Sequence, residues 1–389
     1  MLIIDNKIDT RSIEKAYRTF KDVKDAPVDL KITKKFSSDF GIVPALIQLI
    51  STWHLKVTNG KILIEATDDK IFEFYSFDYF FPSIIYCWAR EIVDTSGRDL
   101  KPILREQNVI YHEKMRKQIT GGGPKALLSC FDHLSVKKGL LNAFYVDGEF
   151  IDNEILFGAA IDKVLKHVTS FNQTLSKKNL PRIYLDLIDI IYELVKNTDN
   201  WATTDQNNKP LSPSTRGVFL KFHKKQQTTL LAEFNEQEGI RKYFSDNFVK
   251  NKQNEIYFLE LSVYDTGIGY VNRYKPKVGG RYSPEEQVDI IKDCLLRNNT
   301  SATGRSKMVK GKGLDRIMDI LDDKGFFWIR TGNVSVYRDL RENRHQTGST
   351  KEEIQLFDWL KGTHGNFSDL EYGQGSVITL VYPLSEFEL

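Results

Sequence analysis

The chain has 389 residues, which is longer than a typical domain with a single hydrophobic core. This length predicts two domains. Its 55 Lys and Arg residues nearly balance 52 Asp and Glu residues, so the net charge of +3 does not imply nucleic-acid binding, although a local basic patch would still permit it. The cysteines Cys87, Cys130 and Cys294 are too scattered for a disulfide framework or a cysteine metal site.

The N-terminal sequence, MLIIDNKIDTRS, reaches acidic residues too early for a signal peptide. The most apolar windows, around residues 41–50 and 77–89, are too short to cross a membrane. Together with the scattered thiols, these features predict a cytoplasmic protein without a membrane segment.

Residues 1–150 are expected to form a smaller α/β domain. A strand and a helix are expected within residues 1–27, and residues 28–33 alternate like a half-buried strand. Apolar side chains recur at helical spacing over residues 42–53, and an Asn-Gly turn then leads into a strand at 61–66. This β-α-β pattern resembles, in outline only, the sulphate-transporter and anti-sigma-antagonist type of domain, and it leaves the role of the domain unknown.

The pattern changes near residue 150, and a second domain is expected over residues 151–389. Helices are expected near residues 154–171 and 184–201, and the second of them carries polar and apolar side chains on opposite sides. Its polar stripe consists of Asp186, Asp189, Glu193, Asn197 and Asn200. Strands are expected at residues 217–223, 228–234 and 255–264. A polar stripe is usually a solvated face, and only the motifs further along the chain favour a binding site here.

Four short motifs follow one another in this second half of the chain. They are Glu193-x-x-x-Asn197 within a helix, Asp265-x-Gly267-x-Gly269 at the end of a strand, Lys310-Gly311-Lys312-Gly313-Leu314 before a helix, and Gly373-x-Gly375-Ser376 at the start of the last strand. One such motif alone would be a weak indication, whereas four in order point to a nucleotide site.

The second and fourth motifs suit a nucleobase. A carboxylate such as Asp265 at a strand end accepts a hydrogen bond from the exocyclic amine of adenine. Gly267 and Gly269 let the backbone turn tightly and approach a planar base without a Cβ clash. Ser376 either supports Asp265 or binds the base through water.

The third motif suits phosphates. The turn at Gly311 and Gly313 precedes a helix that begins at Leu314, so its backbone N–H groups lie at the positive end of the helix dipole. Lys310 and Lys312 add positive charge there, with a solvated basic loop as the competing interpretation.

The first motif suits a metal and a catalytic base. Asn197 offers a neutral oxygen ligand to Mg²⁺, an ion that keeps several waters and bridges to phosphates. Glu193 lies one helical turn earlier and is placed to activate an attacking water as general base. The alternative is a Glu193 that is structural or contacts a Mg²⁺-bound water, without a part in catalysis.

In order and spacing, the four motifs resemble those of the GHKL ATPase superfamily, which contains DNA gyrase, Hsp90, histidine kinases and MutL. The resemblance covers roughly residues 155–385. It implies a Bergerat-type α/β sandwich with a mixed, mainly antiparallel sheet and helices on one face. It also implies Mg²⁺ coordination at Asn197, adenine recognition at Asp265, and phosphate enclosure at Gly311 and Gly313.

Two features bear on turnover. The segment 270–310 corresponds to the lid that closes over ATP in the family. The chain ends just after the last strand, so we expect no transducer domain, and hydrolysis would rely on Arg305, Lys310 or a partner. The family often has alanine and aspartate where this chain has Thr198 and Asn200.

The sequence therefore predicts a protein that binds Mg²⁺ and ATP, hydrolyses the ATP, and signals to its N-terminal domain, a protein partner or a second copy of itself. Two alternatives remain open. One is a histidine-kinase-like enzyme that phosphorylates a partner, favoured by the C-terminal position of the domain and its closing strand. The other is a regulatory module that binds a nucleotide without turnover.

Overall fold

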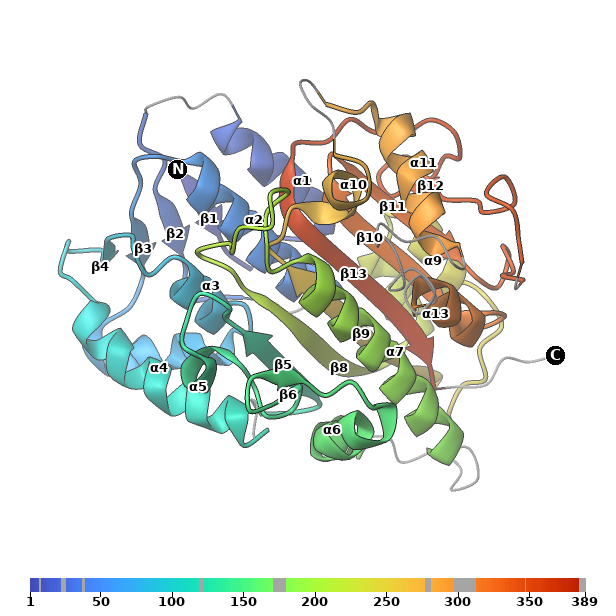
Figure 1. The fold of residues 1–389 in the computed structure, drawn as a ribbon, viewed down its shortest axis with the longest axis horizontal. Coiled ribbons are helices and arrows are strands. Elements are labelled where there is room, and N and C mark those ends of the chain that lie inside the picture. Colours follow the sequence, from blue (N-terminus) through green and yellow to red (C-terminus); the bar gives the residue numbers. More distant parts are fainter. Residues whose placement is uncertain are drawn as a thin grey trace.

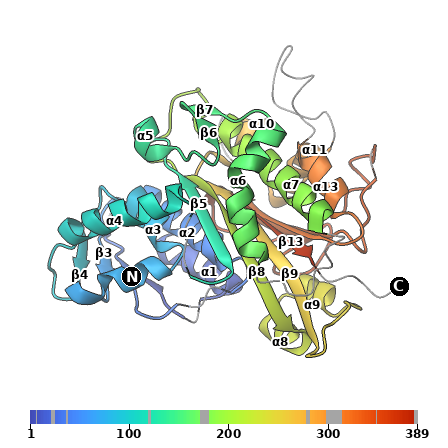
Figure 2. The same cartoon turned by 90° about the horizontal axis from the view of Figure 1, so that it is seen from below.

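A computed structural model of the chain describes residues 1–6, 8–21, 26–36, 39–118, 122–170, 180–276, 281–296, 313–346 and 348–384. The protein is a mixed α/β structure with one parallel sheet, one larger antiparallel sheet and helices packed around both (Figures 1 and 2). This coarse class agrees with the α+β expectation from the sequence.

The first sheet is parallel and comes from the N-terminal part of the chain. Its strands, in spatial order, are β1 (Leu2–Ile4), β2 (Leu30–Ile32), β3 (Ile62–Ile64) and β4 (Ile92–Asp94). The helices of this part are α1 (Thr10–Tyr17), η1 (Arg18–Phe20), α2 (Ile42–Lys56), η2 (Asp68–Ser76), α3 (Phe80–Tyr86) and α4 (Lys101–Arg116). The β-α-β unit expected over residues 28–66 is present as β2, α2 and β3.

Helix α2 explains the most apolar window of the sequence. Every residue from Ile42 to Trp53 is buried, because the helix lies between the parallel sheet and the larger sheet (Figure 1). A helix that is apolar on all sides needs such cover on all sides. Among the described helices, none is both long enough and apolar enough to cross a membrane.

The larger sheet has seven strands in the order β12-β11-β10-β13-β9-β8-β5. Its strands are β5 (Lys125–Cys130), β8 (Arg216–Gln226), β9 (Glu255–Asp265), β10 (Phe326–Gly332), β11 (Val334–Asp339), β12 (Phe357–Asp358) and β13 (Gly373–Pro383). All six neighbouring pairs are antiparallel, so the expectation of a mixed sheet is corrected for the described strands.

Helices cover both faces of this sheet, where the sequence predicted helices on one face (Figure 2). One face carries α6 (Glu154–Thr169), α7 (Leu180–Trp201) and α13 (Gly313–Leu321), and the other carries α2, α8 (Gln227–Glu233) and α9 (Glu238–Phe244). The reason is visible in β9, where Leu259 and Leu261 belong to the core under α7 while Ile256 and Phe258 pack with α8 and α9. A strand that is apolar on both sides needs cover on both.

Residues 228–233 belong to a helix, α8 (Gln227–Glu233), rather than to the strand expected over residues 228–234. Strand β8 continues to Gln226, and α8 then turns back so that Leu230 packs beneath the sheet. Tertiary burial of one side outweighs the β preference of two threonines.

The edge strand β5 precedes residue 150, where the boundary between domains was expected. It pairs with β8, so the seven-stranded sheet draws on both sides of that boundary. The described residues also share one large core that runs from β1 to β13. The division into 1–150 and 151–389 stays a prediction. The remaining short elements are α5 (Val136–Gly139), β6 (Tyr145–Val146), β7 (Glu149–Phe150), α10 (Gly269–Tyr274) and α11 (Pro284–Leu295).

Candidate functional site

The predicted site residues that the structure describes gather in two groups. One lies beside Glu193 and Asn197 of α7, and the other lies beside the residue that follows α7. In the first group, a Cβ added to Gly313 at the start of α13 would lie 2.7 Å from Glu193 Oε2 and 3.4 Å from Asn197 Nδ2. In the second group, Asp265 at the end of β9 pairs with Ser376 at the start of β13. The third motif thus meets the first, and the second meets the fourth.

Asp265, the carboxylate of the second group, is buried, with 8% of its surface exposed. It accepts a hydrogen bond from the backbone N–H of Gly267 at 2.8 Å and another from the backbone of Ser376. Burial raises the pKa of this carboxyl to about 6, while the two backbone bonds and the nearby Arg216 guanidinium act in the opposite direction. Asp265 is therefore held at a strand end in an environment that penalises its charge.

The glycines around Asp265 are required by contacts within the protein itself. Gly269 and Gly375 have φ values of +78° and +70°, which side chains rarely adopt. A Cβ on Gly375 would lie 2.0 Å from the carbonyl oxygen of Asp265, and one on Gly267 would lie 2.8 Å from Ala202 Cα. Close packing of the loop after β9 against β13 and the residue after α7 thus explains these glycines without a ligand.

Ser376 contacts Asp265 through its backbone, and its hydroxyl lies 2.9 Å from the hydroxyl of Thr331. Thr331 Oγ1 donates to the carbonyl oxygen of Gly375 at 3.1 Å. The sequence analysis missed Thr331, since nothing in the sequence indicates that β10 lies beside β13.

Arg316 is a second residue that sequence analysis missed. It lies on α13 and reaches Asp189 at 2.6 Å, Glu193 at 3.4 Å and Glu154 of α6 at 2.7 Å. Burial raises the pKa of Glu193, and Arg316 acts against that rise. The acidic stripe of α7 is thus an ion-paired surface facing α13. Nothing in the sequence indicates that α13 lies beside α7, so no local signal marked Arg316 as the partner of these carboxylates.

Lys324, which follows α13, pairs with Asp186, the remaining acidic residue of the α7 stripe. Its ammonium lies 2.8 Å from Asp186 Oδ2. Leu314, by contrast, is buried in the core beneath α13. Its side chain supports the helix rather than the surface that faces Glu193.

Arg305, Lys310, Gly311 and Lys312 lie outside the described residues, as do residues 277–280 and 297–310 of the predicted lid. The described part of the lid contains α10 and α11.

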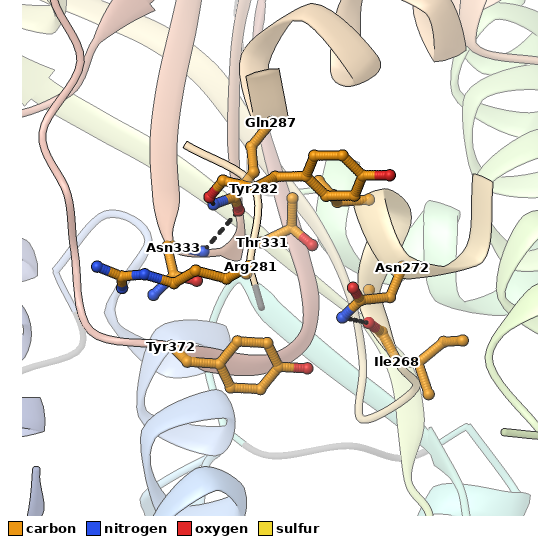
Figure 3. A pocket seen from close by; sticks show the side chains of 11 residues that line it. Ile268, Asn272, Arg281, Tyr282, Gln287, Thr331, Asn333 and Tyr372 are labelled. Carbon is orange, nitrogen blue, oxygen red and sulfur yellow. Dashed lines mark hydrogen bonds between the residues drawn. The ribbon is translucent and has the colours of Figure 1, made fainter. Parts of the chain in front are cut away.

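A pocket of about 220 Å³ opens beside the loop that follows Asp265 (Figure 3). Tyr282 and Tyr372 lie on opposite sides of it, and the carboxamide of Gln287 accepts a hydrogen bond from Asn333 N at 3.0 Å. The lining residues are Ile268, Gly269, Val271, Asn272, Arg281, Tyr282, Gln287, Thr331, Gly332, Asn333 and Tyr372. Among the predicted site residues that the structure describes, only Gly269 lines it, so the pocket adjoins the motif residues.

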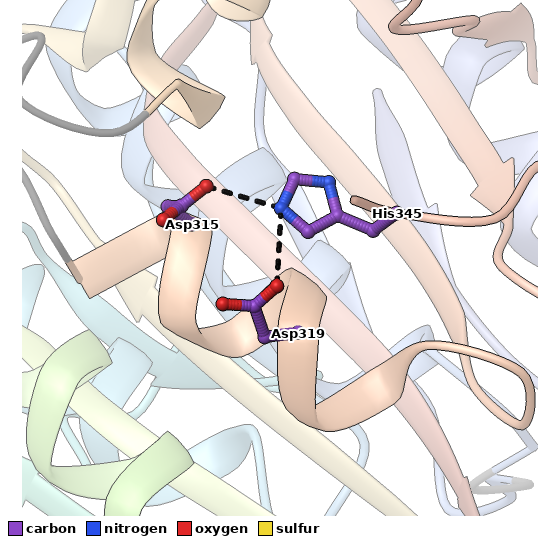
Figure 4. Close-up of side chains that lie close together, drawn as sticks. All are labelled: Asp315, Asp319 and His345. Atoms are coloured by element: carbon purple, nitrogen blue, oxygen red, sulfur yellow. Dashed lines mark hydrogen bonds and ion pairs between the residues drawn. The ribbon is translucent and has the colours of Figure 1, made fainter. Parts of the chain in front are cut away.

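Asp315, Asp319 and His345 offer three ligand atoms within 4.8 Å of one another (Figure 4). The hydrogen bonds around His345 oppose a metal at this place. Arg338 donates to His345 Nδ1 at 3.4 Å, so the ring proton lies on Nε2 and is donated to Asp315 Oδ1 at 3.0 Å. A metal on Nε2 would displace that proton and leave Nδ1–H facing a guanidinium.

Comparisons of the chain with known protein families, with curated proteins and with solved structures found no match.

Proposed function

We propose that the chain binds Mg·ATP where α7, the end of β9 and the start of α13 converge, and that it hydrolyses the ATP slowly as a conformational switch. In this proposal the second half of the chain is a Bergerat-type domain of the GHKL class. Asp265 receives the adenine amine, Asn197 holds the magnesium ion, and Glu193 activates water. Arg305, Lys310, Gly311 and Lys312 bind the phosphates in this proposal.

One observation carries the proposal. Motif residues far apart in the sequence are neighbours in space, with Gly313 against Glu193 and Asn197, and Ser376 against Asp265. The order of the motifs along an antiparallel sheet crossed by one long helix supports the same class. The helices on the second face of the sheet depart from the expected single layer.

The proposal is tested with γ-labelled ATP and Mg²⁺ added to the full-length protein, alone and with candidate partners. Release of free phosphate supports the ATPase, and label on a protein supports the kinase. Asp265→Asn should weaken ATP binding at least about 10-fold, because an amide cannot provide the charged acceptor. Retention of ATP affinity by Asp265→Asn would overturn the assignment.

Asp339→Asn is the matched control for that variant. Asp339 also ends a buried strand, is 6% exposed, and has a pKa raised by burial to about 6. It lies on β11, three strands from β9 in the sheet order, so its substitution should leave ATP affinity unchanged.

A second candidate is a module that binds a nucleotide without turnover. Its support is the ion pair between Glu193 and Arg316, which occupies the carboxylate that hydrolysis would need. Tight ATP binding with neither free phosphate nor labelled protein would select this candidate.

A further inference from the structure

Gln374 connects the loop after Asp265 to the rest of the molecule. It lies in the turn between Gly373 and Gly375 that opens β13. Its side-chain amide donates to the carbonyl oxygens of Thr266 at 3.1 Å and Gly267 at 2.5 Å. The side-chain N–H groups of Gln374 thus hold the backbone of residues 266 and 267. The N–H of Gly267 in that backbone donates to Asp265.

The backbone of the same residue is held by the N-terminal part of the chain. Gln374 N donates to Thr52 Oγ1 of α2 at 2.9 Å. Thr52 is 1% exposed, and its hydroxyl donates in turn to the carbonyl oxygen of Gln48 at 2.7 Å. The hydroxyl is therefore a buried acceptor for the turn, and its removal would leave the part-buried N–H of Gln374 without that partner.

The turn is also enclosed sterically from the N-terminal side. A Cβ added to Gly373 would lie 2.9 Å from Arg330 Nη1 and 3.3 Å from Gln48 Cδ. Gln48 Nε2 donates to the carbonyl oxygen of Arg330 at 3.3 Å, and Arg330 is paired with Glu14 of α1. Residues of α1 and α2 thus fix one side of the turn, while Gln374 fixes the loop on the other.

We propose that Gln374 is a positioning residue through which α2 sets the ATP affinity of the loop at Asp265. The inference rests on the proposed function and names the route by which the N-terminal part of the chain regulates the site. Binding linkage is reciprocal, so a nucleotide that tightens the loop also stabilises the contact between Gln374 and Thr52.

Three variants of the full-length protein test this route. Thr52→Val removes the hydroxyl at nearly constant volume, Thr52→Ser keeps it, and Gln374→Met removes the bonds to the loop. ATP affinity, measured by calorimetry with Mg²⁺, should fall about 10-fold in Thr52→Val and Gln374→Met and stay near wild type in Thr52→Ser.

Thr169→Val is the matched control for loss of a buried helical hydroxyl. Thr169 is 5% exposed, and its hydroxyl donates to the carbonyl oxygen of Leu165, four residues earlier, as that of Thr52 does to Gln48. It lies on α6, so the variant should lose stability without losing ATP affinity.

Hydrogen exchange supplies a readout that a merely structural role would not move. ATP should slow amide exchange in α2 and at Gln374 of the wild type, and Gln374→Met should abolish the effect in α2. Wild-type ATP affinity in both Thr52→Val and Gln374→Met, with binding lost in Asp265→Asn, overturns the route and leaves the proposed function standing. A wild type that binds no ATP overturns both.

Discussion

At the scale of single residues, the buried carboxyl of Asp265 lowers the stability of the protein when it is ionised. An aspartate in an unfolded chain has a pKa of about 3.9, whereas burial raises that of Asp265 to about 6. Between these values the folded state retains a proton that the unfolded state releases, so stability falls as pH rises from about 4 to 6. Above that window the cost of the buried charge is fully present.

Asp265→Asn should therefore stabilise the nucleotide-free protein by about 1–3 kcal/mol at pH 7.5, since a pKa rise of about two units corresponds to roughly that free energy. Urea unfolding at pH 4.5 and pH 7.5 checks this, with the variant gaining clearly more at the higher pH. Equal differences between variant and wild type at both pH values would contradict the pKa assignment.

Glu193 provides a second prediction at this scale. Glu193→Ala should keep ATP bound and stop its hydrolysis, because in the proposed site Glu193 acts on the attacking water and not on the base. Calorimetric ATP affinity and phosphate release, measured on the same preparation, separate the two effects. Loss of binding in this variant would show that Glu193 holds the nucleotide instead.

At the scale of elements, the sequence predicted local structure best where the backbone accepts only one residue type, glycine. Glycines flank Asp265 because the backbone there has positive φ or no room for a Cβ, and that need marks the loop in the sequence. The β-α-β unit around α2 was likewise visible as alternating and helical apolar spacing.

Contacts between distant elements could not be predicted, because local sequence patterns do not show which elements become neighbours. The contact of Arg316 with Glu193 needs α13 beside α7, and the bond of Thr331 to Gly375 needs β10 beside β13. Helix α8 was missed for the same reason, since the burial of Leu230 under the sheet decides its form.

The packing of α13 on α7 leads to a prediction about Arg316. Arg316→Met leaves Glu154, Asp189 and Glu193 without their shared cation, and the mutual repulsion of these carboxylates should lower stability at pH 7.5. Arg316 is about one-third exposed, so solvent limits the loss to about 1 kcal/mol. The deficit should shrink toward pH 4 as the carboxylates become protonated, which thermal melting at both pH values checks.

Arg344→Met is the control for Arg316→Met. Arg344 pairs with Asp322 at 2.8 Å but is 52% exposed, so its loss should have little effect. A deficit for Arg316→Met that does not exceed that of Arg344→Met would mean that the carboxylates of α6 and α7 do not depend on Arg316.

At the scale of the whole molecule, a buried ion pair joins the first helix to the larger sheet. Arg330 of β10 is 2% exposed and lies 2.8 Å from Glu14 of α1, while its other N–H groups donate to the carbonyl oxygens of Gly332 and Glu371 at 2.6 Å. A guanidinium so enclosed requires its carboxylate partner, because water cannot replace it. The N-terminal part is thus fastened to the edge of the candidate site.

Glu14→Gln should therefore destabilise the whole chain by about 3 kcal/mol, since it leaves the buried Arg330 charge without its counter-ion. Arg11→Ala is the control, because the Arg11–Glu236 pair also joins α1 to a distant segment but is 40% and 61% exposed, which limits its contribution to less than about 1 kcal/mol. Urea unfolding of both variants at pH 7 measures the difference. If α1 were only loosely attached, the two losses would be equal; if it shares the core of the larger sheet, only Glu14→Gln shifts the main unfolding transition.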